Sequence, residues 1–171
     1  MSDHDLLHAL YVPFDRIHIL INRTQCATSV FAAEISPIEG GAPYYRESIG
    51  IGGFTLGVFD LQRYLCDTFR LATTVPAQLI LIMPLDRLSE ETRKALVTGP
   101  LEELDREQLA MRISSDTAMR SFEIAELRPL GITMRDHLVA RGLVAAHPEE
   151  QSFGFLIDLD QLIRLSLEMA A

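Results

Sequence analysis

The chain has 171 residues, of which 48% are hydrophobic, and this length suits one compact domain or two small ones that share a core. The hydrophobic fraction is too high for a disordered chain. The formal net charge is −9 and a broad basic patch is lacking, which argues against nucleic acid as a partner. The excess negative charge also repels anionic membrane surfaces.

The sequence also favours a protein of the cytoplasm. Residues 1–5 are acidic where a secretory signal would be basic, so we expect no export. The nearest approach to a membrane-spanning stretch, Leu79–Met83, is only long enough for a strand. Cys26 and Cys66 could form a disulfide, but two free thiols are the favoured interpretation in a cytoplasmic protein.

Short strands separated by turn residues dominate the pattern along the chain. Residues 3–11 favour a short helix that Pro13 ends, because three leucines fall on one side of it. Residues 26–31 are expected to return along the strand before them, after a turn at residues 22–25. Strands are expected at residues 16–21, 26–31, 48–51, 54–59, 79–83, 109–113, 118–122, 142–146 and 153–157.

Two of these strand pairs carry hairpin signals. Gly52 and Gly53 separate residues 48–51 from residues 54–59, and a polar turn at residues 147–150 separates the last two strands. Residues 125–128 favour a turn, whereas helical and extended structure both stay open for residues 133–140.

A charged segment, residues 84–108, interrupts the strand pattern. Ser89 can cap a helix that carries Glu90 and Glu91 in its first turn, and Gly99 with Pro100 ends it. Residues 101–108 favour a second helical piece. The segment is either an amphipathic pair of helices that covers a barrel or a docking element for a partner.

One pattern occurs twice, at residues 55–65 and 153–163. Each copy has an apolar run, then Asp-Leu, two polar residues and two large apolar ones. Asp60 and Asp158 are therefore expected to cap the helices that follow, and the repeat predicts two related halves. We predict a mainly β fold with short helices, built from small barrels rather than a layered α/β sheet.

The residues that could carry chemistry have plainer explanations. Gly50–Thr55 faintly matches a phosphate-binding loop, but a strand follows it instead of a helix, which favours a hairpin turn. Asp60, Asp158 and Asp160 could form a catalytic carboxylate pair, but helix capping explains their positions better. We therefore expect no enzyme activity and no cofactor.

The histidines likewise give no clear metal site. His4 and His8 have the spacing of ligands on one helix face, but a solvated chain terminus is the favoured interpretation. His18, His137 and His147 have no cysteine or histidine near them in the sequence, so we expect surface or half-buried side chains and no bound metal.

Several segments follow one another in a recognisable order: residues 33–35, 47–53, 54–61, 111–122, 127–130, 142–144 and 155–163. Taken together, they resemble the CheW-like domain, a family of adaptor proteins in bacterial chemotaxis. The resemblance covers about residues 16–165 apart from the charged segment. It implies a single domain of two intertwined five-stranded barrels that meet along an apolar seam. The first barrel would lie mostly in residues 16–83, the helical insert at 84–108 and the second half at 109–171, with strand exchange between barrels left open.

The resemblance also implies a function. The family's members have no chemistry of their own and bridge chemoreceptor tips to the regulatory domain of a histidine kinase. Gly52 stands where the family has an arginine associated with receptor coupling, so we expect a weakened receptor contact at Gly52 and Gly53. An alternative function is a stand-alone ligand-binding or regulatory module in which the seam opens into a pocket.

Kinase docking is the family contact that we expect this chain to keep. It would use the surface near residues 32–35 and 44–45, where Glu34 matches the family's acidic residue and Ile35 its apolar one. Tyr45 would add an amphipathic anchor. Alternatively, Ile35 and Tyr45 fill the core of the first barrel.

Overall fold

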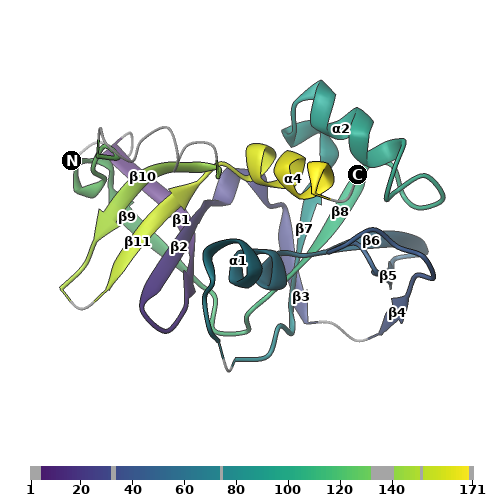
Figure 1. The fold of residues 1–171 in the computed structure, drawn as a ribbon, viewed down its shortest axis with the longest axis horizontal. Helices are drawn as coiled ribbons and strands as arrows, with labels where there is room; N and C mark the ends of the chain where they lie inside the picture. Colours follow the sequence, from purple (N-terminus) through teal and green to yellow (C-terminus); the bar gives the residue numbers. More distant parts are fainter. Residues whose placement is uncertain (1–4, 32–33, 74, 132–140, 151, 170–171) are drawn as a thin grey trace.

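Two β-sheets, with helices between and above them, make up the structure, which is a computed structural model (Figure 1). The structure describes residues 5–31, 34–73, 75–131, 141–150 and 152–169. No helix in these ranges is both long enough and apolar enough to cross a membrane.

The first sheet has five strands in the order β10-β11-β2-β1-β9. Its members are β1 (Leu6–Pro13), β2 (Ile17–Asn22), β9 (Ala118–Glu123), β10 (Leu143–Pro148) and β11 (Phe153–Ile157). Neighbouring strands run antiparallel except β11 and β2, which are parallel.

The second sheet has six strands in the order β3-β7-β8-β6-β5-β4. Its members are β3 (Thr28–Phe31), β4 (Ile35–Pro37), β5 (Glu47–Ile51), β6 (Phe54–Asp60), β7 (Leu79–Pro84) and β8 (Gln108–Ile113). Neighbouring strands run antiparallel except β6 and β8, which are parallel.

The two sheets repeat one topology. Strands β5-β6-β8-β7-β3 follow one another with the same relative directions as β10-β11-β2-β1-β9, and β4 is added at the edge of the second sheet. Each sheet also takes strands from both halves of the chain, since β1 and β2 join the C-terminal strands and β8 joins the N-terminal ones. The duplication expected from the sequence is therefore present.

Each repeat ends in a helix capped by an aspartate, as predicted. The Asp60 side chain accepts a hydrogen bond of 3.0 Å from the N–H of Arg63 at the start of α1 (Leu61–Phe69). The Asp158 side chain accepts bonds of 3.1 and 3.4 Å from the N–H groups of Asp160 and Gln161 in α4 (Leu159–Glu168). Both caps satisfy N–H groups that have no partner inside the helix.

The main core lies along the seam where the sheets and the helices meet. Its buried side chains include Val12, Ile19, Ile21, Phe59, Leu61, Leu65, Leu81, Met83, Met111, Ile157, Leu162 and Ile163. The opposite face of each sheet holds a smaller interior of its own. That of the six-stranded sheet contains Ile49, Leu56, Val58, Ile80, Ile82 and Ala110, and that of the five-stranded sheet contains Ala9, Leu20 and Phe122. The apolar seam expected from the resemblance is thus present.

The prediction of two five-stranded barrels needs correction. One sheet has six strands, and neither is closed into a barrel in the part of the chain that the structure describes. The edge strands of the six-stranded sheet are short, with four residues in β3 and three in β4. β4 also ends at Pro37, which has no N–H to continue a ladder.

The predicted helix at residues 3–11 is wrong, because Leu6–Pro13 form β1 between β2 and β9. Alternate β1 side chains enter the two interiors: Leu7, Ala9 and Tyr11 contact the smaller one, and Leu10 and Val12 contact the seam. This two-sided burial has the period of a strand. The strand expected at residues 26–31 exists as β3, but it pairs with β7 and does not return along β2.

The charged segment contains one α-helix, α2 (Glu90–Val97), capped by Ser89 as predicted. The second helical piece at residues 101–108 is wrong, since turns lead from α2 into β8. The Asp105 side chain accepts hydrogen bonds from the N–H groups of Glu107 and Gln108, and the backbone N–H of Asp105 donates to the carbonyl of Thr55. These bonds compete with helix formation.

The insert covers α4 (Figure 1). The Ser89 N–H and hydroxyl both donate to the Asp160 carboxylate, at 2.8 and 3.0 Å. Of the two interpretations of the insert, these contacts agree with the covering one, although the insert covers α4 and not a barrel and has one α-helix instead of two. Cys26 and Cys66 are free thiols, as favoured from the sequence. The open prediction for residues 133–140 lies outside the described residues.

Candidate protein-interaction surface

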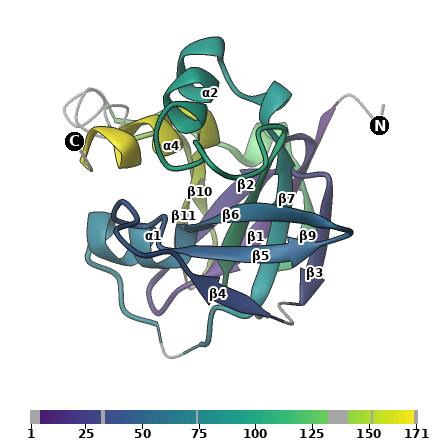
Figure 2. The same cartoon turned by 90° about the vertical axis from the view of Figure 1, so that its right-hand side faces the viewer.

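The predicted partner-binding residues map mainly to one end of the six-stranded sheet, at β4 and the β5–β6 hairpin (Figure 2). β4 is the outermost strand at this edge, and β5 pairs with it antiparallel. An outermost strand leaves part of its backbone unpaired, which makes a sheet edge a natural site for contact with another chain.

Glu34 and Ile35 begin this edge. Glu34 is exposed just before β4. Ile35 lies opposite Ile49 and is half-buried against the small interior of the sheet, so part of its side chain stays accessible. An exposed carboxylate beside a half-buried aliphatic side chain suits a contact in which apolar area gives affinity and charge gives selectivity. Residues 32–33, which belong to the same predicted surface, lie outside the described residues.

The hairpin tip carries Gly52 and Gly53 with φ angles of 58° and 87°. Both angles are in the left-handed region, which two-residue turns of type I′ require and glycine adopts at no steric cost. A Cβ atom at Gly52 would meet no atom within 4 Å, so the backbone angle, and not space, restricts a side chain there. The hairpin interpretation of Gly50–Thr55 is confirmed.

Phe54 is the residue of this surface that the sequence analysis missed. It follows the glycine turn, and its side chain is 63% exposed. The sequence pattern predicts a strand at Phe54 but does not indicate that the strand begins where no other element covers the sheet. A large exposed aromatic side chain is a common anchor of protein interfaces.

Tyr45 is a correction to the predicted surface. Its side chain is 2% exposed, stacks on Phe59 and shares a hydrogen bond of 2.8 Å with the hydroxyl of Ser166 in α4. Burial raises the pKa of Tyr45 above its usual range, which keeps the phenol neutral. Tyr45 therefore fills the seam, as the alternative interpretation held, and cannot anchor a partner.

An ion-pair network supports the sheet beside this surface. One Arg112 nitrogen lies 2.8 Å from the Glu47 carboxylate and another lies 3.1 Å from the Asp60 carboxylate, which ties β8 to β5 and β6. Asp60 thus both caps α1 and holds an arginine. Asp158 caps α4 and Asp160 bonds to Ser89, so all three carboxylates make structural contacts.

The seam between the sheets is filled with buried apolar side chains. A surface hollow of about 770 Å³ lies beside the ends of α1 and α4, where Tyr64, Asp67, Arg141 and Glu168 line it. The alternative function, in which the seam opens into a pocket, stays a prediction.

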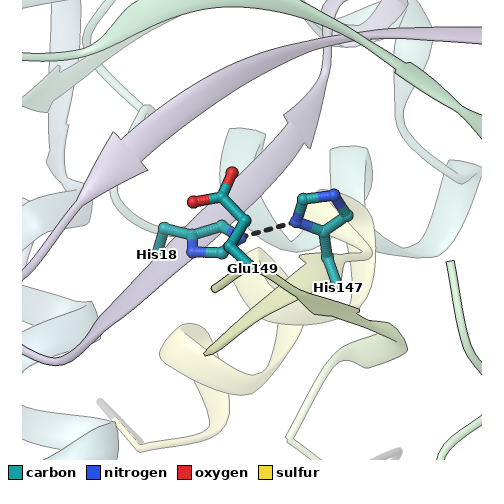
Figure 3. A group of neighbouring side chains, drawn as sticks. All are labelled: His18, His147 and Glu149. Carbon is teal, nitrogen blue, oxygen red and sulfur yellow. Dashed lines mark hydrogen bonds between the residues drawn. The ribbon is translucent and has the colours of Figure 1, made fainter. Parts of the chain in front are cut away.

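Histidines that are far apart in the sequence come together in the five-stranded sheet. His18 Nε2 and His147 Nδ1 lie 2.8 Å apart, with the Glu149 carboxylate beside them (Figure 3). Burial and the charges of His147 and Arg120 lower the pKa of His18 to about 4, against an opposing effect of Glu149. The expectation of surface or half-buried side chains is wrong for this pair, because both are buried. The β10–β11–β2 pairing brings the two residues together.

The terminal histidines give a different result. His8 lies on β1 and shares a hydrogen bond with Ser121, so the helical spacing proposed for His4 and His8 is not formed at His8. His4 and His137 lie outside the described residues.

A comparison with solved structures finds a likeness over nearly the whole chain. The crystal structure of the scaffolding protein TtCheW from Thermoanaerobacter tengcongensis aligns with a TM-score of 0.59 and 10% sequence identity, over 91% of this chain and 91% of that one. A scan against protein-family models finds no match, and neither does a search of curated proteins. The chain thus shares the mainly β, two-sheet fold of this scaffolding protein, at a sequence identity that shows the fold alone.

Proposed function

We propose that this chain is a non-catalytic adaptor in chemotaxis-type signal transduction, which couples a histidine kinase regulatory domain, a chemoreceptor or both. The fold shared with a scaffolding protein over 91% of both chains carries the proposal. Function does not follow from a fold alone, so the surface must supply the rest of the argument.

The surface at β4 and the β5–β6 hairpin supports a contact with another β protein. It combines an exposed carboxylate at Glu34, a half-buried Ile35 and an exposed Phe54 beside the edge of a sheet. We propose that the kinase regulatory domain docks here, edge strand to edge strand. Such a contact buries apolar side chains and depends little on any one charge beyond Glu34. The chain would act in the cytoplasm, where both partners present their docking surfaces.

Charge reversal at Glu34 tests this contact. We expect Glu34→Lys to weaken binding of the cognate kinase regulatory domain about tenfold or more, because it places a cation at an interface that selects an anion. Calorimetric titration measures the affinity. The melting temperature should stay unchanged, since Glu34 is solvent-exposed.

Glu168→Lys is the matched control, because it makes the same charge change at an exposed site at the end of α4. Its binding should equal that of the unaltered protein. Equal binding by Glu34→Lys and the unaltered protein, with both folded, removes this surface from the proposal. Absence of binding by the unaltered protein itself contradicts the kinase partner.

The receptor contact is proposed to be weak, because Gly52 offers no side chain where the resembling family has an arginine. Gly52→Arg should then strengthen binding to a chemoreceptor tip. Gly52→Asn is the control, since asparagine tolerates a φ of 58° better than most residues and carries no charge. A receptor affinity that is already high, and the same for both variants, contradicts this part of the proposal.

A further inference from the structure

The pair of histidines in the five-stranded sheet forms part of a three-residue cluster that no part of the proposed function uses. His18 lies on β2, His147 lies on β10, and Glu149 follows directly after β10 (Figure 3). One nitrogen of each ring and a carboxylate oxygen all lie within 4.8 Å of one another. His18 and His147 are 0% and 4% exposed, whereas Glu149 is accessible at the rim.

A glycine makes room for this pair. In the sheet register, Gly154 of β11 lies directly between His147 on one side and His18 on the other. A Cβ atom at position 154 would collide with the His18 ring. The two rings therefore meet over a backbone position that has no side chain, and any other residue there would separate them.

The hydrogen bonds already orient His18 as a ligand. Its Nδ1 lies 2.8 Å from the hydroxyl of Ser152, and that hydroxyl donates to the Glu149 carboxylate at 3.2 Å. Nδ1 of His18 therefore carries the proton, and the lone pair of Nε2 faces His147. A ligating histidine that donates its other ring N–H to a neighbour is the usual arrangement around bound metals.

Nε2 of His18 and Nδ1 of His147 are separated by 2.8 Å because they share a proton. Two nitrogens on one tetrahedral zinc ion stand about 3.3 Å apart, given Zn–N bonds of about 2.0–2.1 Å. A small opening of the rings, with movement of the inter-ring proton to the outer nitrogen of His147, would let both nitrogens bind one ion.

The cluster can be reached from solvent. A surface hollow of about 660 Å³ is lined by His147, Glu149, Glu126, Glu150 and Arg120, so its carboxylates outnumber its cations. Arg120 lies 3.7 Å from the Glu149 carboxylate and over the ring of Tyr11, and it competes with a metal for Glu149. Its side chain is 49% exposed, so it can swing into water.

We propose that His18, His147 and Glu149 form a binding site for a divalent transition-metal ion of the zinc class, with water from the hollow as the fourth ligand. Two imidazoles and one carboxylate are a donor set that zinc accepts, with a position left open. The bound ion would join β2, β10 and the turn after β10 on either side of β11. It would thereby stabilise the five-stranded sheet.

The test uses the full chain without an affinity tag, freed of metal with a chelator and titrated with zinc chloride. We expect one zinc ion per chain by calorimetry and a higher melting temperature with zinc than without it. Cobalt(II) should give the strong visible absorption of a tetrahedral site. Absence of binding, or of any rise in melting temperature, overturns the proposal.

Three variants locate the ion. Glu149→Gln keeps the shape of an accessible side chain and should weaken zinc binding about tenfold or more, and His147→Gln should weaken it further. His8→Gln is the control outside the cluster and should bind as the unaltered protein does. Arg120→Gln should strengthen binding, because it removes the cation that competes with the metal for Glu149. Equal affinity of Glu149→Gln, His147→Gln and the unaltered protein places the ion elsewhere and overturns the proposal.

Discussion

The two sheets repeat one topology but fill their small interiors differently. The small interior of the six-stranded sheet contains aliphatic side chains, among them Ile49, Leu56 and Ile80, and Arg112 with its ion pairs lies beside it, opposite Ile80. The five-stranded sheet places a histidine pair and its carboxylate beside Ala9 and Leu20. Within the described residues, the histidine cluster therefore belongs to the five-stranded sheet.

Equivalent positions show how the difference arises. Leu56 and Gly154 each lie four residues before the aspartate that caps the following helix. The residue opposite Leu56 is Ile49, and the residue opposite Gly154 is His147. Where one repeat has two aliphatic side chains in contact, the other has a glycine and a histidine, and the vacated volume holds the ring of His18.

The histidine cluster carries a cost in free energy that the aliphatic side chains of the other interior do not. A buried histidine must stay neutral or find a compensating charge, whereas buried leucine and isoleucine are insensitive to pH.

The largest effect is expected from acid on the metal-free protein. The pKa of His18 falls from an ordinary 6.5 to about 4 in the folded chain, mainly because of burial. Between these values the unfolded chain binds more protons, so stability is complete above about pH 6.5 and is lost as the pH falls through 4. A shift of this size corresponds to about 3 kcal/mol in the free energy of unfolding. Urea midpoints at several pH values, with chelator present, measure it.

His18→Gln separates this contribution from that of other groups. The variant should lose stability at neutral pH but show a flatter decline between pH 6.5 and 4. The groups that face His18 are His147, Glu149 and Arg120, together with the ring of Tyr11, and they remain in the variant. If the unaltered protein and the variant decline in parallel, the buried histidine does not distinguish the two sheets.

A smaller effect is expected from adding one methyl group to each sheet. Gly154→Ala should lower the free energy of unfolding by about 1–3 kcal/mol, because the new Cβ collides with His18 in a filled interior. Gly50→Ala is the matched strand glycine of the other sheet, and a Cβ there meets no atom within 4 Å. It should change stability by less than about 0.5 kcal/mol. Equal denaturant midpoints for the two variants contradict the special role of Gly154.

Local patterns in the sequence predicted the elements that depend on local physics. The capped helices after Asp60 and Asp158, the hairpin at Gly52 and most strands follow from short-range signals, and the structure confirms them. The prediction of an N-terminal helix is wrong because leucines at positions 6, 7 and 10 fit the period of a helix as well as that of a strand buried on both faces. Its pairing with β2 and β9, over residues far apart, decided the outcome.

The candidate sites depended on long-range contacts and were predicted less well. Glu34 and Ile35 lie at an accessible edge, whereas Tyr45 is buried against Ser166, which is 121 residues away in the sequence. His18 and His147 are 129 residues apart, and a parallel strand pair brings them together. No spacing rule for metal ligands spans such a distance, although a lone glycine in a predicted strand, Gly154, marked an unusual close approach.

The smallest contrast concerns the two capping aspartates. Asp60→Ala and Asp158→Ala should each cost about 0.5–2 kcal/mol of stability, because each leaves helix N–H groups without a partner. Asp60→Ala should cost more stability than Asp158→Ala, since the other oxygen of Asp60 also holds Arg112 at 3.1 Å in a largely buried pair.

Asparagine at these positions separates the capping contribution from the ion-pair contribution, because it caps a helix as well as aspartate does but carries no charge. Asp158→Asn should therefore be nearly neutral. Asp60→Asn should still cost about 1 kcal/mol, because the Arg112 guanidinium loses a charged acceptor. Denaturant midpoints measured at pH 7 test whether the Arg112 contact stabilises the fold. Equal midpoints for the two asparagine variants would show that the Arg112 contact does not contribute to folding, so that the two caps contribute equally to stability.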